Sequence, residues 1–302
     1  MRFFVTGAGG FVGSHVASML AAAGHQVIAH YRRMPARPDA RFETLVHDLS
    51  TPDLTVPGRV DLVIHAAAAA AADHEPGGGD PDRYLTDNII AAKHLLDWAS
   101  GSDVGGILFL SSLSVYGTIS VPVVEPSTVP VQPGLYGASK LFAERLFAMA
   151  VAAGGPPVVV ARLPGVLGPA APRNWLTNTL AKLKTGDAVE IFNAEADFNN
   201  AVHVADLAAW AVHLANTAWH GFHTLTLAAA APMAIRQVVM QMHDAVNSTA
   251  AVTTVPKVQQ AFCVSTAQAT SEFNYQPMTM VAMVNRFVSE NHGHDWPSEW
   301  VK

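Results

Sequence analysis

Tyr136 and Lys140 stand four residues apart in the segment Tyr136-Gly137-Ala138-Ser139-Lys140. A helix would place both side chains on one face. A phenol has an unperturbed pKa of about 10 and is a poor base at neutral pH, but a neighbouring ammonium lowers that pKa. The pair therefore predicts acid–base chemistry. Its alternative is an ordinary surface helix, where this spacing is common.

A cluster of hydroxyl groups precedes that pair in the chain. Ser111, Ser112 and Ser114 follow the apolar run that begins at Ile107. Ligands bind at the carboxyl ends of strands in doubly wound folds, so one of these serines could hold a substrate oxygen. A serine-rich turn explains the cluster equally well when it is taken alone.

A glycine-rich loop lies between a predicted strand and a predicted helix near the start of the chain. The pattern G-x-G-x-x-G fails because Val12 takes the last glycine position, whereas Gly7, Gly10 and Gly13 have a spacing that fits. Such glycines allow a tight turn, a close approach of backbone N–H groups to a pyrophosphate, and helix–strand packing. We therefore predict a dinucleotide cofactor held by this loop, including Phe11 and Val12; the alternative is a plain turn.

The end of the second predicted strand bears on the choice of cofactor. NAD binders carry an acidic residue there for the ribose hydroxyls, but this chain has Tyr31-Arg32-Arg33. Guanidinium groups are well shaped to hold a 2′-phosphate. We therefore predict NADP rather than NAD as the favoured cofactor, although two arginines could also simply begin a solvated loop.

The elements that must position these residues alternate between the periods of strands and helices. This alternation predicts an α/β fold with a doubly wound, Rossmann-type parallel sheet. We expect a dinucleotide-binding domain over residues 1–165 and a smaller substrate-binding region over 166–302, partly interleaved with the first. The predicted strands are Arg2–Val5, Gln26–His30, Leu62–His65, Ile107–Ser111 and Val158–Arg162, and the predicted helices are Phe11–Ala23, Asp82–Ser100, Tyr136–Ala153, Trp175–Lys184, Ala205–Ala215 and Ile235–Val246.

The composition of the chain limits the kinds of molecule that it can be expected to bind. The chain has 302 residues and a net charge of −6, which disfavours nucleic acid and anionic membranes. Its single cysteine, Cys263, excludes an internal disulfide, and the spacing of its histidines matches no metal motif, so we predict no metal. We expect a cytoplasmic protein without a membrane span, acting on a small molecule, with a homodimer left open.

Taken together, these segments resemble the extended short-chain dehydrogenase/reductase superfamily, in the branch called the NAD-dependent epimerase/dehydratase family. The resemblance covers nearly the whole chain. It rests on T-G-A-G-G-F-V-G at 6–13, H-D-L at 47–49, V-I-H-A-A-A at 63–68, Asn88, S-S-L-S-V-Y-G at 111–117, Y-G-A-S-K at 136–140, R-L-P-G-V-L-G-P at 162–169 and V-H-V-A-D-L-A at 202–208.

The resemblance implies a role for each matching residue. Tyr136 would be the acid–base and Lys140 would lower its pKa and hold the nicotinamide ribose. Ser112, four residues before Tyr116, would bond the reacting oxygen. Further cofactor-binding residues implied in this way are Asp48 and Leu49 at the adenine, Ala66, Ala67 and Ala68 at the phosphate and ribose, Asn88 as a support, and Pro164 and Val166 near the nicotinamide; Ser112, Ser114 and Asn174 are the expected substrate-binding residues.

Departures from the family pattern bear on the reaction. Leu113-Ser114 stands where dehydratases carry Asp-Glu, which disfavours dehydration. The arginine that many nucleotide-sugar enzymes carry before V-H-V is absent from Phe198–Ala201. We therefore expect hydride transfer between a nicotinamide and a carbinol or keto carbon of a sugar, sugar derivative or small polyol. The alternatives are a nucleotide-sugar 4-epimerase and a non-catalytic NAD(P)-binding sensor.

Overall fold

The centre of the molecule is a seven-stranded parallel sheet with the strand order β12-β7-β5-β4-β1-β2-β3. The computed structural model describes residues 1–70, 79–256 and 260–297. The sheet strands are β1 (Arg2–Thr6), β2 (Gln26–Tyr31), β3 (Glu43–Val46), β4 (Leu62–His65), β5 (Ile107–Ser112), β7 (Val158–Leu163) and β12 (Phe222–Thr226). The strand order reverses between β1 and β4, so a ligand crevice is expected at their carboxyl ends. The predicted doubly wound parallel sheet is confirmed.

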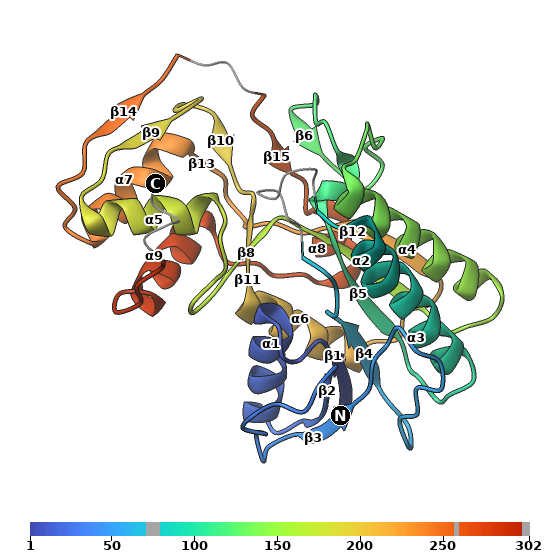
Figure 1. The fold of residues 1–302 in the computed structure, drawn as a ribbon. Helices are drawn as coiled ribbons and strands as arrows, with labels where there is room; N and C mark the ends of the chain where they lie inside the picture. Colours follow the sequence, from blue (N-terminus) through green and yellow to red (C-terminus); the bar gives the residue numbers. More distant parts are fainter. Residues whose placement is uncertain (71–78, 257–259, 298–302) are drawn as a thin grey trace.

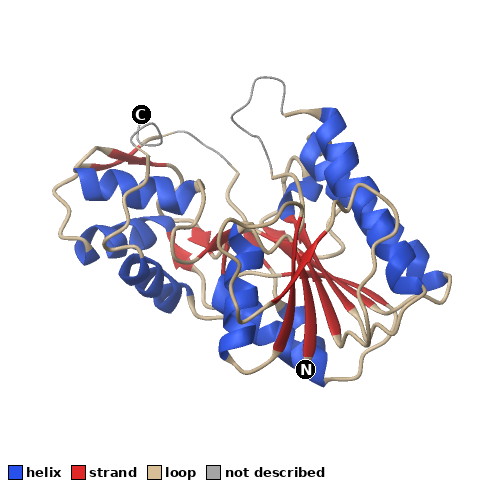
Figure 2. Cartoon of the chain, turned by 60° about the horizontal axis from the view of Figure 1, so that its bottom comes forward, coloured by secondary structure: helices blue, strands red, loops and turns tan. Residues whose placement is uncertain are grey.

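Helices cover both faces of this sheet (Figure 2). Side chains of a strand alternate between faces, so Phe3 packs into the core beneath α1 (Phe11–Ala22) and α6 (Val204–Asn216). Its neighbour Phe4 packs into the core beneath α3 (Ala91–Ser100) and α4 (Leu135–Ala152). The strands are buried on both faces and are therefore almost continuously apolar.

The helix predicted over Asp82–Ser100 is present but is not uniform. It begins as α2 (Pro81–Tyr84), widens into the π-helix η1 (Leu85–Ile90) and continues as α3. The Asp80 side chain caps its start by accepting a hydrogen bond from the Asp82 N–H. Asp87 and Asn88, both in the π-helical segment, are buried. Such widened turns often occur at functional sites.

Parts of the second half of the chain build a smaller lobe with its own apolar core, seen beside the sheet in Figure 1, while β7, β12 and α6 belong to the sheet and its helix layer. Short strands form four further pairs: β8 pairs with β11, β9 with β14, β10 with β13, and β6 with β15. The bounds are β6 (Val123–Val124), β8 (Gly165–Leu167), β9 (Val189–Ile191), β10 (Asp197–Phe198), β11 (Ala201–His203), β13 (Met233–Ala234), β14 (Val252–Thr254), β15 (Cys263–Val264), η2 (Leu113–Tyr116), α5 (Trp175–Thr185), α7 (Ile235–Ala245), α8 (Ala267–Phe273) and α9 (Met280–Glu290). Across the described residues, no helix combines the length and the apolar character that crossing a membrane requires.

Candidate active site

Two adjoining cavities follow the carboxyl ends of the central strands. The first has a volume of about 550 Å³ and the second of about 350 Å³. Gly10, Ala66 and Ala68 line both, so the cavities meet beside the glycine-rich loop. The first cavity is lined by Gly7, Gly9, Gly10, His30, Tyr31, Arg32, Arg33, Leu49, Ala66, Ala67, Ala68, Asp87 and Ala91. The result is an elongated cleft at the sheet's switch point.

The glycine-rich loop needs its glycines for steric reasons. Gly7 has a φ of +69°, and a Cβ there would lie 2.7 Å from the Cα of Ala67. A Cβ at Gly13 would collide with the carbonyl oxygen of Gly7. The N–H of Gly10 closes the turn on that same oxygen at 2.9 Å, and α1 begins at the next residue. The helix N-terminus therefore faces the cleft with its positive dipole end, as a pyrophosphate site requires.

Neutral histidines support the floor of the first cavity. His30 Nδ1 accepts a hydrogen bond from the Gly7 N–H at 3.4 Å, and its Nε2 lies 2.8 Å from the carbonyl oxygen of His47. The Thr6 hydroxyl lies 2.8 Å from His65 Nδ1 and accepts from the Ala67 N–H. Burial lowers the pKa of His30 to about 4 and that of His65 to about 3. Both rings are therefore uncharged at neutral pH and act as hydrogen-bonding supports.

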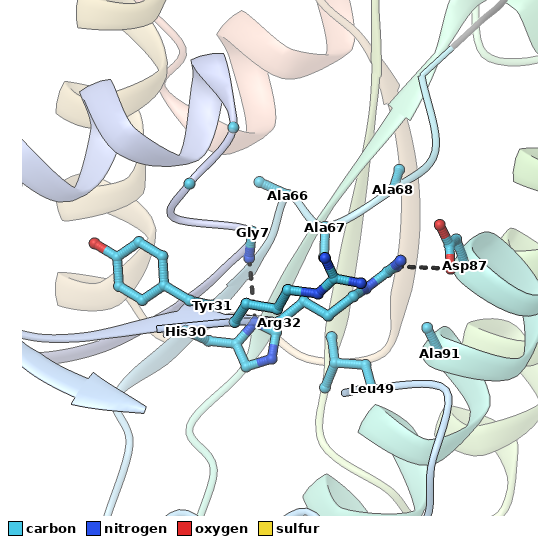
Figure 3. Close-up of a pocket in the computed structure, with 13 residues that line it drawn as sticks. Gly7, His30, Tyr31, Arg32, Leu49, Ala66, Ala67, Ala68, Asp87 and Ala91 are labelled. Atoms are coloured by element: carbon cyan, nitrogen blue, oxygen red, sulfur yellow. Dashed lines mark hydrogen bonds and ion pairs between the residues drawn. The ribbon is translucent and has the colours of Figure 1, made fainter. Parts of the chain in front are cut away.

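Arg32 reaches from the end of β2 to the opposite wall of the first cavity (Figure 3). Its Nη2 lies 2.6 Å from Oδ1 of Asp87, which is 8% exposed, and its Nε lies 3.9 Å from Oδ1 of Asp48. Arg83, one turn before Asp87, approaches the other carboxylate oxygen at 3.7 Å. Arg33 lines the same cavity and is exposed. Both arginines predicted to bind phosphate thus line the cavity, but Arg32 is paired with a carboxylate and Arg33 is exposed to solvent.

The second cavity brings together the predicted catalytic residues. Ser112 arrives at the end of β5, while Tyr136 and Lys140 lie on the first turns of α4. The lining of this cavity comprises Gly10, Phe11, Val12, Gly13, Ala66, Ala68, Ala70, Leu110, Ser111, Ser112, Tyr136, Lys140, Leu163, Pro164, Gly165, Val166, Pro172, Arg173 and Asn174. A hydroxyl, a phenol and an amine therefore share one small chamber with the end of the glycine loop.

Lys140 is the most perturbed cation of this chamber. It is 2% exposed, and burial lowers its pKa to about 7, while the carboxylate of Glu144 acts in the opposite direction. A lysine in this range changes protonation near neutral pH. Its charge can therefore respond to an anion or a phenolate beside it.

Glu144 and Arg162 form a buried ion pair behind the chamber. Arg162 Nη2 lies 2.6 Å from Glu144 Oε2, and its Nη1 donates to the Tyr116 hydroxyl at 2.9 Å. The Ser111 hydroxyl donates to Glu144 Oε1 at 2.5 Å. Ser111 and Ser112 both line the chamber, but the Ser111 hydroxyl is engaged by Glu144, whereas that of Ser112 is not.

Of the remaining predicted residues, Asn88, Asp48 and Ser114 lie outside the linings of the two cavities, whereas Asn174 lines the second. Asn88 accepts from the Ala69 N–H at 2.7 Å and donates to the Ser139 hydroxyl at 2.8 Å, so it ties the alanine loop to α4. Asp48 accepts from the Ser50 N–H. Ser114 is exposed and its hydroxyl accepts from Ser112, outside the described lining of the chamber. Asn174 lines the chamber and also caps α5.

Two residues of the site escaped the sequence analysis. Glu144 stands four residues after Lys140 on the same helix, so helical spacing could have indicated it. Asp87 precedes Asn88 directly and follows Arg83 by four residues, but nothing in the sequence announces its contact with Arg32. Among the residues that the structure describes, no group of three His, Cys, Asp or Glu side chains could hold a metal ion.

The residues present fit a dinucleotide. The glycines at positions 7 and 13 lie where a Cβ would strike backbone, and the loop ends at the N-terminus of α1. The cleft beside them continues from the end of β2 to Tyr136 and Lys140. The first cavity would hold the adenosine half and the second the nicotinamide half.

The fold is a Rossmann-type parallel sheet, and Tyr136 and Lys140 lie on α4 at the cleft beside it. A model of the NAD dependent epimerase/dehydratase family matches residues 3–228. The chain belongs to this family.

Individual relatives are more distant. A UDP-glucose 4-epimerase of Corynebacterium glutamicum is 33% identical over 149 residues, which are 47% of this chain and 44% of that protein. A dTDP-6-deoxy-L-talose 4-dehydrogenase (NAD(P)(+)) of Kitasatospora kifunensis is 29% identical over 188 residues, covering 60% and 57%. The chain thus spans about half the length of the curated relatives it matches.

Among solved structures, UDP-glucuronic acid 4-epimerase from Bacillus cereus in complex with NAD has a TM-score of 0.79 with this chain. The match covers 97% of this chain and 99% of that one at 21% identity. At this identity the likeness concerns the fold.

Proposed function

We propose that this chain is an NAD(P)-dependent enzyme that transfers a hydride to or from a carbinol or keto carbon of a sugar, sugar derivative or small polyol. The observation that carries the proposal is the chamber of about 350 Å³ in which Ser112, Tyr136 and Lys140 meet the end of the glycine loop. When bound, the nicotinamide ring supplies the hydride donor or acceptor.

The residues of the chamber divide the remaining work. Tyr136 moves the proton to or from the reacting oxygen. Ser112 donates a hydrogen bond to that oxygen and so orients the carbon. Lys140, when protonated, stabilises the Tyr136 phenolate and binds a ribose hydroxyl. Leu110 and Leu163, both buried, form apolar parts of the wall and limit the access of water.

The proposed cofactor preference is for NADP over NAD. It is supported by the absence of an acidic residue among His30, Tyr31, Arg32 and Arg33 at the end of β2, and by the position of both arginines on the first cavity. A 2′-phosphate would meet guanidinium groups there rather than a carboxylate of that strand end.

A nucleotide-sugar 4-epimerase is the second candidate. It is favoured by the named function of the Corynebacterium relative and by a further cavity of about 210 Å³. Phe192, Phe198 and Trp175 line this cavity, and Trp175 directly follows Asn174 of the chamber. Against it, Asn199 stands in the segment where many such enzymes carry an arginine. Its amide is consumed by backbone groups of Ala229 and Val264.

The test of the proposed function has two stages. Calorimetry with NADPH and NADH first measures cofactor binding. Incubation with oxidised cofactor and a panel of sugars and polyols, or with reduced cofactor and ketoses, then follows nicotinamide absorbance, and NMR of the products reveals epimerisation. Binding of UDP at micromolar or lower Kd selects the second candidate. Cofactor binding without turnover of any substrate, including UDP-sugars, selects the sensor.

The proposal includes a cytoplasmic homodimer. Leu135, Phe142 and Met149 are exposed apolar side chains on α4. They recur every seventh residue, so they follow one side of the helix. Sedimentation of the wild type and of Phe142→Glu tests the assembly: the wild type should sediment as a dimer and the variant as a monomer.

A further inference from the structure

Asp87 and Arg32 form an ion pair between two walls of the first cavity (Figure 3). Arg32 comes from the end of β2, and Asp87 comes from the π-helical segment more than fifty residues later. Their side chains meet at 2.6 Å, and both line the space that would take the adenosine half of a dinucleotide. The guanidinium that the sequence offers to a 2′-phosphate is therefore already held by a carboxylate.

The two members of the Asp87–Arg32 ion pair differ in their exposure to solvent. The Asp87 side chain is 8% exposed, whereas that of Arg32 is 52% exposed. The carboxylate is fixed in the helix with Arg83 as a second partner, while the guanidinium lies on the open side of the cavity. A 2′-phosphate approaching Arg32 would have to replace Asp87 or share the guanidinium with it.

Arg33 offers a contrast. It lines the same cavity and is exposed, and no ion pair links it to a residue in the described part of the chain. A phosphate that binds Arg33 breaks no ion pair among the described residues, whereas one that binds Arg32 competes with a buried carboxylate.

We propose that Asp87 is a specificity-determining residue that restrains Arg32 and thereby limits the preference of this enzyme for NADP over NAD. The inference rests on the proposed function, since it concerns the cofactor of that same site. Arg33 supplies the main contact to a 2′-phosphate while Arg32 is held by Asp87. Arg32 becomes a strong phosphate ligand only when the Asp87 carboxylate is replaced.

The test uses calorimetric Kd values for NADPH and NADH, and the readout is the ratio of the two affinities. Asp87→Asn keeps the size of the side chain and removes its charge. We expect it to raise the NADPH:NADH affinity ratio about tenfold, the effect of one additional charge-assisted hydrogen bond to phosphate. Asp87→Glu, which restores the carboxylate, should return the ratio toward that of the wild type.

Asp82→Asn is the matched control. It makes the same change of charge in the same helical stretch, but Asp82 is exposed and lies outside the lining of the cavity. We expect its affinity ratio to stay within about twofold of the wild type, because exposed charges at a distance are screened by salt. An equal rise in Asp82→Asn and Asp87→Asn would reduce the effect to net charge and overturn the proposal.

Arg32→Ala supplies the second, independent measurement. In the wild-type background it should lower the affinity ratio by about twofold, less than Arg33→Ala does. In the Asp87→Asn background it should lower the ratio about tenfold, because the two residues are coupled. Should Asp87→Asn fail to fold, the comparison of Arg32→Ala with Arg33→Ala still tests the proposal. A smaller fall of the NADPH:NADH affinity ratio in Arg32→Ala supports it, and an equal or larger fall overturns it.

Two outcomes overturn the inference and are distinct from failure of the proposed function. An unchanged ratio in folded Asp87→Asn, or a tenfold loss in Arg32→Ala alone, shows that Asp87 does not restrain Arg32. Failure of the wild type to bind either dinucleotide overturns the proposed function itself and the inference with it.

Discussion

The Nζ of Lys140 lies 4.3 Å from the centroid of the Phe109 ring, inside the protein. The ring's electron-rich face attracts the ammonium, yet burial still lowers the pKa of Lys140 to about 7. The Lys140 amine therefore lies where burial opposes its positive charge.

Replacing Lys140 should raise the stability of the protein and lower its activity. Lys140→Met keeps a flexible apolar chain against Phe109 and removes the buried charge. We expect the variant to unfold at a higher temperature than the wild type at pH 6–7. The expected gain is on the order of 5 kcal/mol, since the pKa falls from 10.5 to about 7 and one pKa unit corresponds to about 1.4 kcal/mol. Turnover and cofactor affinity should both fall.

The stability gain in Lys140→Met should depend on pH. The folded-state pKa of about 7 lies below the ordinary lysine value of 10.5, so the unfolded wild type holds more protons between these values. Wild-type stability relative to the variant therefore rises with pH through this window, and the gain disappears only above the unfolded pKa of 10.5. Lys93→Met, at an exposed lysine, should track the wild type. A pH-independent difference in unfolding free energy would contradict this prediction.

Tyr136→Phe tests the proton transfer itself. The substitution keeps the ring and its contact with Tyr84 but removes the hydroxyl. We expect turnover to fall by a factor of about 10² or more, with the Kd of NADPH changed little. Tyr84→Phe removes a neighbouring phenol that does not line the chamber and should stay within about threefold of the wild-type rate. Full activity in Tyr136→Phe would place the acid on another residue.

Breaking the ion pair of Glu144 and Arg162 should lower the free energy of unfolding. Glu144→Gln leaves the Arg162 guanidinium buried without its counter-charge, which costs about 3–5 kcal/mol. Denaturant unfolding should report this loss. The double variant Glu144→Gln with Arg162→Met should be less destabilised than the sum of the two single variants, because the charges are lost together. Strict additivity would mean that the two groups do not act as a pair.

Gly13→Ala should damage the cleft through the backbone. The new methyl group would strike the Gly7 carbonyl oxygen, so the loop or α1 must shift. We expect dinucleotide affinity to fall at least tenfold and the melting temperature to drop, as for other overpacking changes. Gly134→Ala, where a Cβ meets no atom within 4 Å, is the control and should bind cofactor normally. Equal binding by both variants would contradict the steric argument.

The sequence predicted the buried parts of the fold well, because central strands such as β5 and β7 are continuous apolar runs with clear boundaries. It did not reveal β3, an edge strand whose residues Glu43–Val46 are only partly buried and carry a weak pattern. It also did not reveal β12 in the less regular half of the chain. The π-helical turn within the helix predicted over Asp82–Ser100 has no signature in helix propensity.

The candidate site was predictable where its residues lie in one segment. The glycine loop, the Ser112 region and the Tyr136–Lys140 pair are local patterns whose order along a parallel sheet brings them to one edge. Long-range pairings were not predictable. Arg32 was expected to be available to a phosphate, but its partner Asp87 is brought to it by the packing of η1 beside the sheet.

The position of β12 at the edge of the sheet, beside β7, has a consequence for synthesis of the protein. Between these two neighbours the chain leaves to build β8, α5, β9, β10, β11 and α6. A nascent chain emerging from the ribosome can therefore finish its cofactor-binding sheet only after residue 226 has left the exit tunnel. Until then β7 exposes an unpaired apolar edge, which is open to aggregation. Slow passage of the ribosome through the 164–221 stretch should lengthen that exposed interval and increase the need for a chaperone.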